Sequence, residues 1–333
     1  KYSLKFVDRF FKIFWGNSVM NGINKSVGYQ LKLARKRNGL TFRELSESIE
    51  HLVTAQAIGK YERGEIEPSF KVLDALSKAL EVNVSYFFEE RKILVSHIDF
   101  RSKTNLTGKD RDEVESVLIK SLEPYLEIEK MLGLNHHIWD NPTKDLNPVT
   151  SIEQGEEFAA RVRLKWQLGQ DPIPNVTGLL EEMGLKVILT TLPEKVSGFT
   201  CIAECKGYNQ GVPVIFVNQT YTLERRRFTL LHELAHRLID STSLSEKDEE
   251  LFSHRFASAF LMPEEYLIRL TGKKRTFFSF RELMDLKHFY KVSGSALLVR
   301  LRDIKVISDS TLTYAFQTIA RTWRSKESQP LEK

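Results

Sequence analysis

Residues 27–88 carry the signals of five short helices that follow one another with little chain between them. Each of the last four runs follows a residue type that is preferred as a helix N-cap: Thr41, Thr54, Ser69 and Asn83. Such side chains accept hydrogen bonds from backbone N–H groups that have no partner inside the helix. Thr41 with Glu44 also forms a capping box, and Gly39 ends the first run. The sequence therefore predicts a small all-α domain.

The order of these motifs resembles the helix-turn-helix domain of the XRE/Cro repressor family, in the blocks "TFREL", "IGKYERG" and "PSFKVLDALSKAL". Members of this family place their third helix in the major groove, where its N-terminal residues contact base edges. The resemblance implies the following base-reading residues: Thr54, Ala55, Gln56, Gly59 and Lys60. It places Arg43 and Arg63 at phosphates, and it implies a homodimer on a palindromic double-stranded DNA operator. A helical protein-interaction module with solvated basic residues is the alternative.

The segment "RRRFTLLHELAHRLID", residues 225–240, contains His-Glu-x-x-His in a run with helical periodicity. Residues four apart lie on one face of a helix, so His232 and His236 can bind the same ion while Glu233 lies beside the pair. A glutamate in that place can take a proton from a water that the ion activates, and pass it to a leaving amine. The alternative is the polar face of a buried helix that binds no ion.

A catalytic zinc of this type needs a third protein ligand, which we expect from the helix that follows. The candidates lie in "EKDEELFSHRFASAFLMP". Glu250 and His254 are i, i+4 neighbours there, whereas we expect Glu249 to point elsewhere.

Residues 151–305 resemble the ImmA/IrrE family of zinc peptidases in three blocks, which read "PVIFVN", "RRRFTLLHELAH" and "ELFSHRFASAFLMP". The resemblance implies Zn²⁺ held by three ligands: His232, His236 and Glu250. It makes Glu233 the general base. Family members commonly have Asn or Asp where this chain has His254. Three roles are open for His254: a ligand in place of the glutamate, a hydrogen-bond partner of the glutamate, or a contact to the oxyanion.

The fold class that we expect is α+β, with an all-α five-helix domain followed by a zincin-like α+β domain that has a small sheet. Three runs predict strands, "LKVILTTL", "FTCIAECKGY" and "VPVIFVN", and "KILVSHIDFR" in the connecting region is a possible further strand. A helix should run from its cap at Ser151 to Gly169. The expected organisation is an N-terminal extension, a helix-turn-helix domain, a connecting region, a peptidase domain and a C-terminal tail: 1–26, 27–90, 91–150, 151–305 and 306–333.

The composition is that of an ordinary globular protein, with 41% hydrophobic and 28% charged residues among 333. A net charge of +5 permits contact with nucleic acid without requiring it. The spacing of Cys201 and Cys205 fits neither a zinc ribbon nor a redox pair, so we expect reduced thiols and a cytoplasmic protein. No apolar run approaches the roughly 20 residues that span a bilayer, so we expect no membrane span.

Two hypotheses about function follow. In the first, a zinc metalloprotease is fused to its own DNA-binding domain and relieves repression, as in a stress response, by cutting a helix-turn-helix repressor, an antitoxin or itself. In the second, the chain is a transcription factor whose peptidase-like domain senses a ligand or stress without proteolytic turnover. Both keep DNA binding and zinc.

Overall fold

The computed structural model describes residues 17–88, 93–99, 108–134, 139–205, 211–323, 326 and 329–331. The chain divides into two compact units, one of residues 1–94 with 107–128 and one of residues 95–106 with 129–333. Each unit contains its own cluster of buried apolar side chains. The α+β fold class predicted from the sequence is confirmed.

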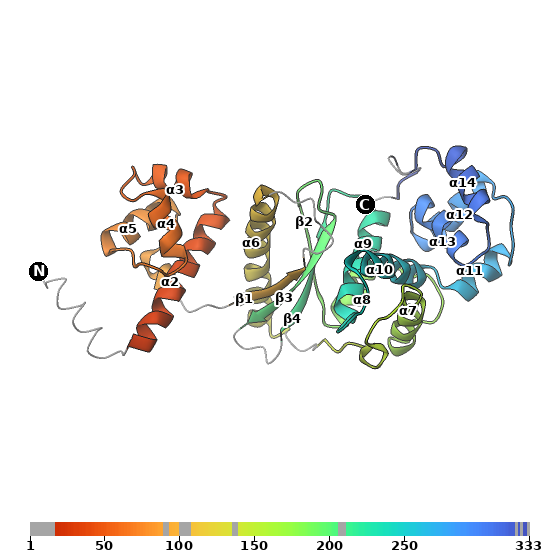
Figure 1. Cartoon of the computed structure of the whole chain (residues 1–333), viewed down its shortest axis with the longest axis horizontal. Coiled ribbons are helices and arrows are strands. Elements are labelled where there is room, and N and C mark those ends of the chain that lie inside the picture. Colours follow the sequence, from red (N-terminus) through yellow and green to blue (C-terminus); the bar gives the residue numbers. More distant parts are fainter. Residues whose placement is uncertain are drawn as a thin grey trace, which may run out of the picture. The chain divides into compact units, whose positions relative to one another are not determined.

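The first unit begins with a set of short helices (Figure 1): α2 (Asn17–Arg37), α3 (Phe42–Ser48), α4 (Ala55–Glu62), α5 (Phe70–Ala79) and a 3₁₀ helix, η1 (Val84–Phe88). The fifth helical segment is therefore a single 3₁₀ stretch and not an α-helix. The first helix begins at Asn17 and not at Val27, because residues 17–26 form helix without the apolar periodicity that signals one. A later helix, α6 (Gly108–Leu132), contains Pro124.

Side-chain caps set the starts of these helices as predicted. The Thr41 hydroxyl accepts a hydrogen bond from Glu44 N at 3.2 Å, and the Glu44 carboxylate accepts one from Thr41 N at 2.7 Å. Thr54 caps α4 through Ala57 N at 3.2 Å. Apolar residues of these helices share one core: Leu31, Ala34, Leu45, Ile49, Ile58, Tyr61, Leu73, Leu76, Leu80 and Phe87.

The second unit is built on a four-stranded mixed sheet, as far as the described residues show, with the order β1-β3-β4-β2. The strands are β1 (Ile93–Asp99), β2 (Lys186–Thr190), β3 (Gly198–Cys205) and β4 (Val212–Asn218). Strand β2 pairs with β4 in parallel and β3 pairs with it in antiparallel fashion. Every residue of β4 is buried, which explains its continuous apolar sequence. Strand β1 comes from the region that we expected to be a connector.

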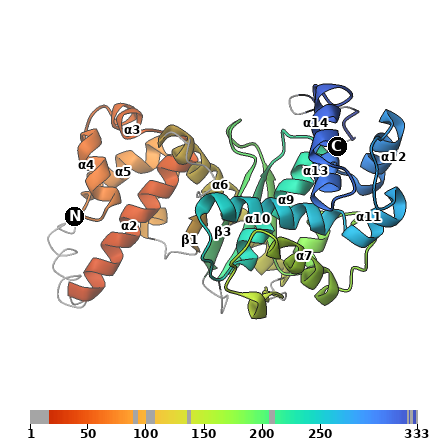
Figure 2. The same ribbon diagram turned by 45° about the vertical axis from the view of Figure 1, so that its right-hand side comes forward.

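Helices pack on this sheet and on one another (Figures 1 and 2). Helix α9 (Leu223–Leu238) packs on β3 and β4, while α10 (Glu246–Leu261) packs on α9 and on α7 (Gln154–Lys165). Helix α8 (Val176–Glu182) contacts β2 and α9. We predicted that Ser151 caps α7, which was wrong. Its backbone N–H and that of Thr150 instead donate to the Gln154 side chain, so the helix begins later.

Four further helices end the unit: α11 (Glu264–Thr271), α12 (Phe280–Tyr290), α13 (Gly294–Asp303) and α14 (Asp309–Gln317). Part of the segment expected to be a tail is thus folded. Trp323 is 5% exposed and lies against Gly294, where a Cβ would come within 2.6 Å of the indole ring. No helix among the described residues is long and apolar enough to cross a membrane.

Candidate metal centre

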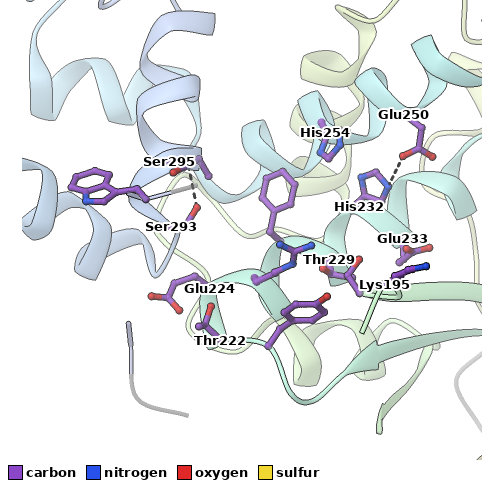
Figure 3. Close-up of a pocket in the computed structure, with 16 residues that line it drawn as sticks. Lys195, Thr222, Glu224, Thr229, His232, Glu233, Glu250, His254, Ser293 and Ser295 are labelled. Atoms are coloured by element: carbon purple, nitrogen blue, oxygen red, sulfur yellow. Dashed lines mark hydrogen bonds and ion pairs between the residues drawn. The ribbon is translucent and has the colours of Figure 1, made fainter. Parts of the chain in front are cut away.

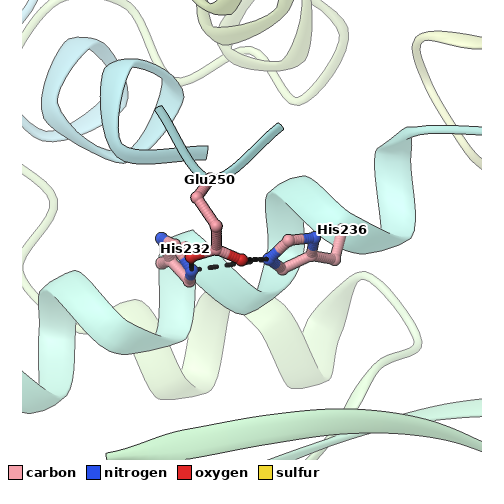
Figure 4. Close-up of side chains that lie close together, drawn as sticks. All are labelled: His232, His236 and Glu250. Atoms are coloured by element: carbon pink, nitrogen blue, oxygen red, sulfur yellow. Dashed lines mark hydrogen bonds and ion pairs between the residues drawn. The ribbon is translucent and has the colours of Figure 1, made fainter. Parts of the chain in front are cut away.

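Helix α9 presents two imidazoles from its buried side. Leu231, Leu234 and Leu238 are completely buried in the core and fix the rotation of the helix. His232 and His236, four positions apart, are each 8% exposed. Their Nε2 atoms lie 3.4 Å from each other, so both rings face one point (Figure 4). The spacing predicted this shared face.

Helix α10 brings a carboxylate to the same point. Glu250 Oε2 lies 3.3 Å from His232 Nε2, and Glu250 Oε1 lies 3.4 Å from His236 Nε2 (Figure 4). The donor atoms of the three side chains all lie within 4.8 Å of one another. Helix α10 is held in register by Ser245, whose hydroxyl accepts a hydrogen bond from Asp248 N. The three side chains form a group that can hold a metal ion.

The size of this group fits a small tetrahedral ion. Zinc binds imidazole nitrogen and carboxylate oxygen at about 2.0–2.1 Å, so neighbouring ligands in a tetrahedron lie about 3.3–3.4 Å apart. The 3.4 Å between the two Nε2 atoms agrees with that spacing, and each Nε2 lies 3.3–3.4 Å from one of the two carboxylate oxygens of Glu250. Two neutral nitrogen donors with one charged oxygen donor also match the chemistry of a catalytic zinc site.

The charges of the group stabilise one another. Burial alone would raise the pKa of Glu250, but its contacts with His232 and His236 outweigh burial and hold that pKa well below its usual range. Burial would likewise lower the pKa of His236, yet Glu249 and Glu250 raise it to about 10. The α10 carboxylates thus favour positive charge at His236, as they would favour a bound cation.

Glu249 does not point away from the site, and our prediction that it would was wrong. Its Oε1 lies 3.4 Å from His236 Nδ1, and the residue is 8% exposed. Glu249 and Glu250 therefore reach opposite nitrogens of the same ring. Sequence spacing gives the direction of each Cβ around a helix, but a long side chain can bend back toward a neighbouring helix.

A cavity of about 660 Å³ opens beside the group (Figure 3). Glu233 lines it together with His232 and Glu250 and is itself only 3% exposed. Strand β3 passes close behind, since a Cβ on Gly198 would lie 3.6 Å from the Glu233 side chain and 2.5 Å from that of Thr229. Glu233 is thus off the ligand group yet on the same cavity, as a general base must be.

The other walls of the cavity come from the first turns of α9 and from segments that we did not select from the sequence. Apart from Ala296 they are lined by polar, charged and aromatic residues: Lys195, Ser197, Tyr221, Thr222, Glu224, Arg225, Phe228, Thr229, Ser293, Ser295 and Trp323. Asn218, at the end of the "PVIFVN" block, organises one wall without reaching the cavity. Its buried amide donates to Leu192 O and Val196 O, both at 3.0 Å, and so holds the loop before β3. The sequence signal for this role was a polar asparagine at the end of an otherwise apolar strand motif.

Arg227 and Tyr221 both lie near the site, but only Tyr221 lines the cavity. Arg227 is buried, and its guanidinium donates to the backbone oxygens of Ile173, Pro174 and Lys291, so it joins three segments and does not face the cavity. Tyr221 lines the cavity, with its hydroxyl bonded to Glu194 O.

His254 lies beside the group and not within it. Its ring is exposed to the cavity, 4.7 Å between centroids from the His232 ring, and it stacks on Phe228 at 5.7 Å. The surrounding protein desolvates the ring on its other sides and, with His232, lowers the pKa of His254 to about 4. The imidazole is therefore uncharged near pH 7.

The expected DNA-contacting residues lie along α4 and its flanks. Thr54, Gln56 and Lys60 are exposed and Ala55 is half-buried. Gly59 is buried, and a Cβ there would lie 3.3 Å from the Arg63 guanidinium and 3.8 Å from the Phe42 ring. Gly59 therefore allows close packing and offers no side chain to a base.

Arg43, Arg63 and Arg35 of this unit differ in exposure and in their ion-pair partners. Arg43 is exposed. Arg63 Nε donates to Glu65 at 2.5 Å in an exposed ion pair. Arg35 is buried and makes a two-pronged pair with Glu62 at 2.6 and 2.9 Å, so it joins α2 to α4. Its role is to position α4 relative to α2.

Two family models match the chain. Residues 31–87 match the one described as Helix-turn-helix, and residues 180–302 match the one described as IrrE N-terminal-like domain, a peptidase family. The chain is a helix-turn-helix DNA-binding domain fused to an IrrE-like peptidase-family domain. Both recognised families are thereby confirmed. The IrrE-like match contains His232, His236 and Glu233 of α9, and Glu249 and Glu250 of α10. No curated protein matches the sequence.

Proposed function

We propose that the protein is a transcriptional regulator whose IrrE-like domain is a zinc-dependent endopeptidase. It cuts a helix-turn-helix repressor or antitoxin, or another copy of its own chain, and so relieves repression. One observation carries the proposal: the Nε2 atoms of His232 and His236 lie 3.4 Å apart, each lies 3.3–3.4 Å from one of the two Glu250 carboxylate oxygens, and Glu233 lines the same cavity. Ion pairs alone account for the contacts between His236 and the glutamates, but two imidazole nitrogens at 3.4 Å in a buried site favour a shared cation.

The residues present fit Zn²⁺. His232 and His236 supply neutral nitrogen donors, and Glu250 supplies the charged oxygen. When bound, Zn²⁺ supplies a Lewis acid that polarises a carbonyl group and makes water more acidic. Glu233 accepts a proton from water as the water oxygen forms a bond to the carbonyl carbon of the substrate. Glu233 then passes that proton to the amine as the C–N bond breaks, so the products are one new carboxyl and one new amine terminus.

The two domains suggest how such a peptidase finds its substrate. A helix-turn-helix domain holds the protein at an operator, where a repressor that binds the same DNA is concentrated. Two chains on a palindromic site would each use α4 in successive major grooves. A DNA-binding regulator of this kind would act in the cytoplasm, which agrees with the expectation from the cysteines.

Glu233→Gln tests the proposal. It removes the base while keeping the size of the side chain, so we expect unchanged zinc content and a loss of cleavage by about 100-fold or more. Zinc-loaded full-length protein is incubated with repressors encoded beside it and with its own chain, and the fragments are identified by mass spectrometry. Glu246→Gln, on an exposed position of α10, is the matched control.

Two outcomes would decide against catalysis. The first is that no candidate is cut by the wild-type protein. The second is that Glu233→Gln leaves DNA binding and regulation in cells unchanged. Together they would support the sensor hypothesis, in which the same fold binds a ligand without turnover.

A further inference from the structure

His254 occupies a place in the cavity that the ligand group does not need. It lies four positions after Glu250 on α10, so its ring is directed to the same side of the helix. Among the described residues, the group that can hold a metal consists of His232, His236 and Glu250, without His254. His254 lines the cavity (Figure 3). The residue is exposed, whereas both α9 histidines are buried.

Contacts fix the plane of the His254 ring. It stacks on Phe228 with an interplanar angle of 27°, and it is tilted by 48° against the His232 ring at 4.7 Å. In the part of the chain that the structure describes, no hydrogen bond or ion pair involves a nitrogen of this ring. The ring is therefore held by packing, while its nitrogens are available to a molecule in the cavity.

We propose that His254 is a catalytic residue that donates a hydrogen bond to the carbonyl oxygen of the scissile peptide as that oxygen becomes negative. The proposal rests on the proposed peptidase function. As water oxygen bonds to the carbonyl carbon and Glu233 takes the proton, the electron pair of the C=O bond moves onto the oxygen. An imidazole carries at least one N–H in either charge state, so it can stabilise this charge next to the metal.

The position decides between the three roles that the sequence left open. As a ligand, His254 would have a ring nitrogen within the 4.8 Å group, which it does not. As a hydrogen-bond partner of Glu250, it would be bonded to that carboxylate, and both Glu250 oxygens instead face His232 and His236. The remaining role, contact with the oxyanion, fits a ring that is exposed to the cavity beside the ligand group.

Two substitutions separate catalysis from packing. His254→Phe keeps an aromatic ring on Phe228 but removes the donor, and His254→Gln keeps an N–H donor. Removal of one oxyanion donor lowers kcat about 100- to 1,000-fold in peptidases. For His254→Phe we expect a fall in kcat of that size with KM and zinc content unchanged, and for His254→Gln a partial recovery of kcat. Loss of zinc from His254→Phe would show a ligand role and overturn the proposal.

A second measurement does not depend on turnover. The full-length protein is loaded with Co²⁺, and inorganic phosphate, a tetrahedral anion, is titrated while the visible spectrum of the ion is followed. We expect phosphate affinity to fall about tenfold or more in His254→Phe and to be largely kept in His254→Gln. Equal affinity in wild type and His254→Phe, or no response of the wild type, would overturn the proposal. A wild type that binds phosphate through His254 but cuts no protein would instead count against the peptidase function alone.

Discussion

Two adjacent glutamates of α10 hold His236 from opposite sides. Glu250 faces its Nε2 and Glu249 faces its Nδ1, each at 3.4 Å. A carboxylate at the outer nitrogen of a metal-binding imidazole fixes the ring orientation and keeps the proton on that nitrogen, which leaves the other nitrogen free for the ion. Among the described residues, both buried Nδ1 atoms lack a hydrogen bond of ordinary geometry, but only that of His236 has an ion-pair contact, with Glu249. Glu249 is thus a positioning residue for one of the two imidazoles.

Removing this carboxylate should weaken metal binding without destroying the ligand group. For Glu249→Ala we expect zinc affinity to fall about 10- to 100-fold, because contacts of this kind contribute that much to other metal sites. Glu249→Gln, which retains an acceptor oxygen, should lose less. Competition with a fluorescent chelator measures the dissociation constant, and Glu246→Gln serves as the control. Equal zinc affinity in Glu249→Ala and wild type would show that the 3.4 Å contact does not support the site.

The sequence predicted the relative placement of site residues that lie close together on one helix. His232 and His236 are one helical turn apart, so their shared face follows from the helix repeat alone. The third ligand lies on another helix, and Glu250 was selected through family resemblance because spacing alone did not separate it from His254. The contact of Glu249 escaped prediction because it depends on how closely α10 packs on α9.

Helix α4 contains the residues expected to distinguish one DNA sequence from another. Its N-terminal turn exposes Gln56 next to the capping residue Thr54, while Ile58 and Tyr61 anchor the opposite face in the core. The buried pair of Arg35 with Glu62 holds the C-terminal end of α4 to α2. The exposed turn is therefore presented on a fixed support, as base contacts require.

Substitutions in this unit should separate base contacts from phosphate contacts. Gln56→Ala is expected to lower affinity for the preferred operator about 10- to 100-fold and to relax the choice of one base, because a bidentate adenine contact is worth about 1–3 kcal/mol. Arg43→Ala should weaken binding to all sequences alike. It should also reduce the slope of log affinity against log salt concentration by about one, because one phosphate contact is lost. Selection from a random duplex library, followed by titration at several salt concentrations, measures both. Identical sequence preference in wild type and Gln56→Ala would contradict the expected register of α4.

Helix starts were predicted where a side-chain cap marks them, as at Thr41, Thr54 and Ser69. The starts of α2 and α7 were not predicted, because no capping side chain marks them in the sequence. Helix α2 begins at Asn17 in a polar stretch, and the start of α7 is set by a glutamine side chain that accepts from two preceding backbone groups. The glutamine contact at α7 is as local as a cap, but it is not the Ser, Thr or Asn cap from which the other helix starts were predicted.

At the scale of the whole molecule, the cavity unites segments that are distant in sequence. Lys195 precedes β3, Ser293 begins α13, and Trp323 follows α14, yet all three line the same space as Glu233. The sequence motifs contain the reacting groups but not these walls, since nothing in a local pattern tells which loops meet. Part of the expected C-terminal tail is for this reason a structural part of the peptidase-family unit.

Metal removal should act on one of the two units. The buried core of the helix-turn-helix domain contains no residue of the metal group, and the two clusters share no member. An ion that binds only folded protein stabilises it by about 4 kcal/mol when its free concentration is 1,000 times the dissociation constant. For a unit of this size that corresponds to a rise in Tm of roughly 8–16 °C. Differential scanning calorimetry with zinc and with a chelator should therefore show one transition that moves and one that does not. Glu250→Gln should abolish the zinc-dependent shift, and equal movement of both transitions would show that the metal group stabilises the chain as a single cooperative body.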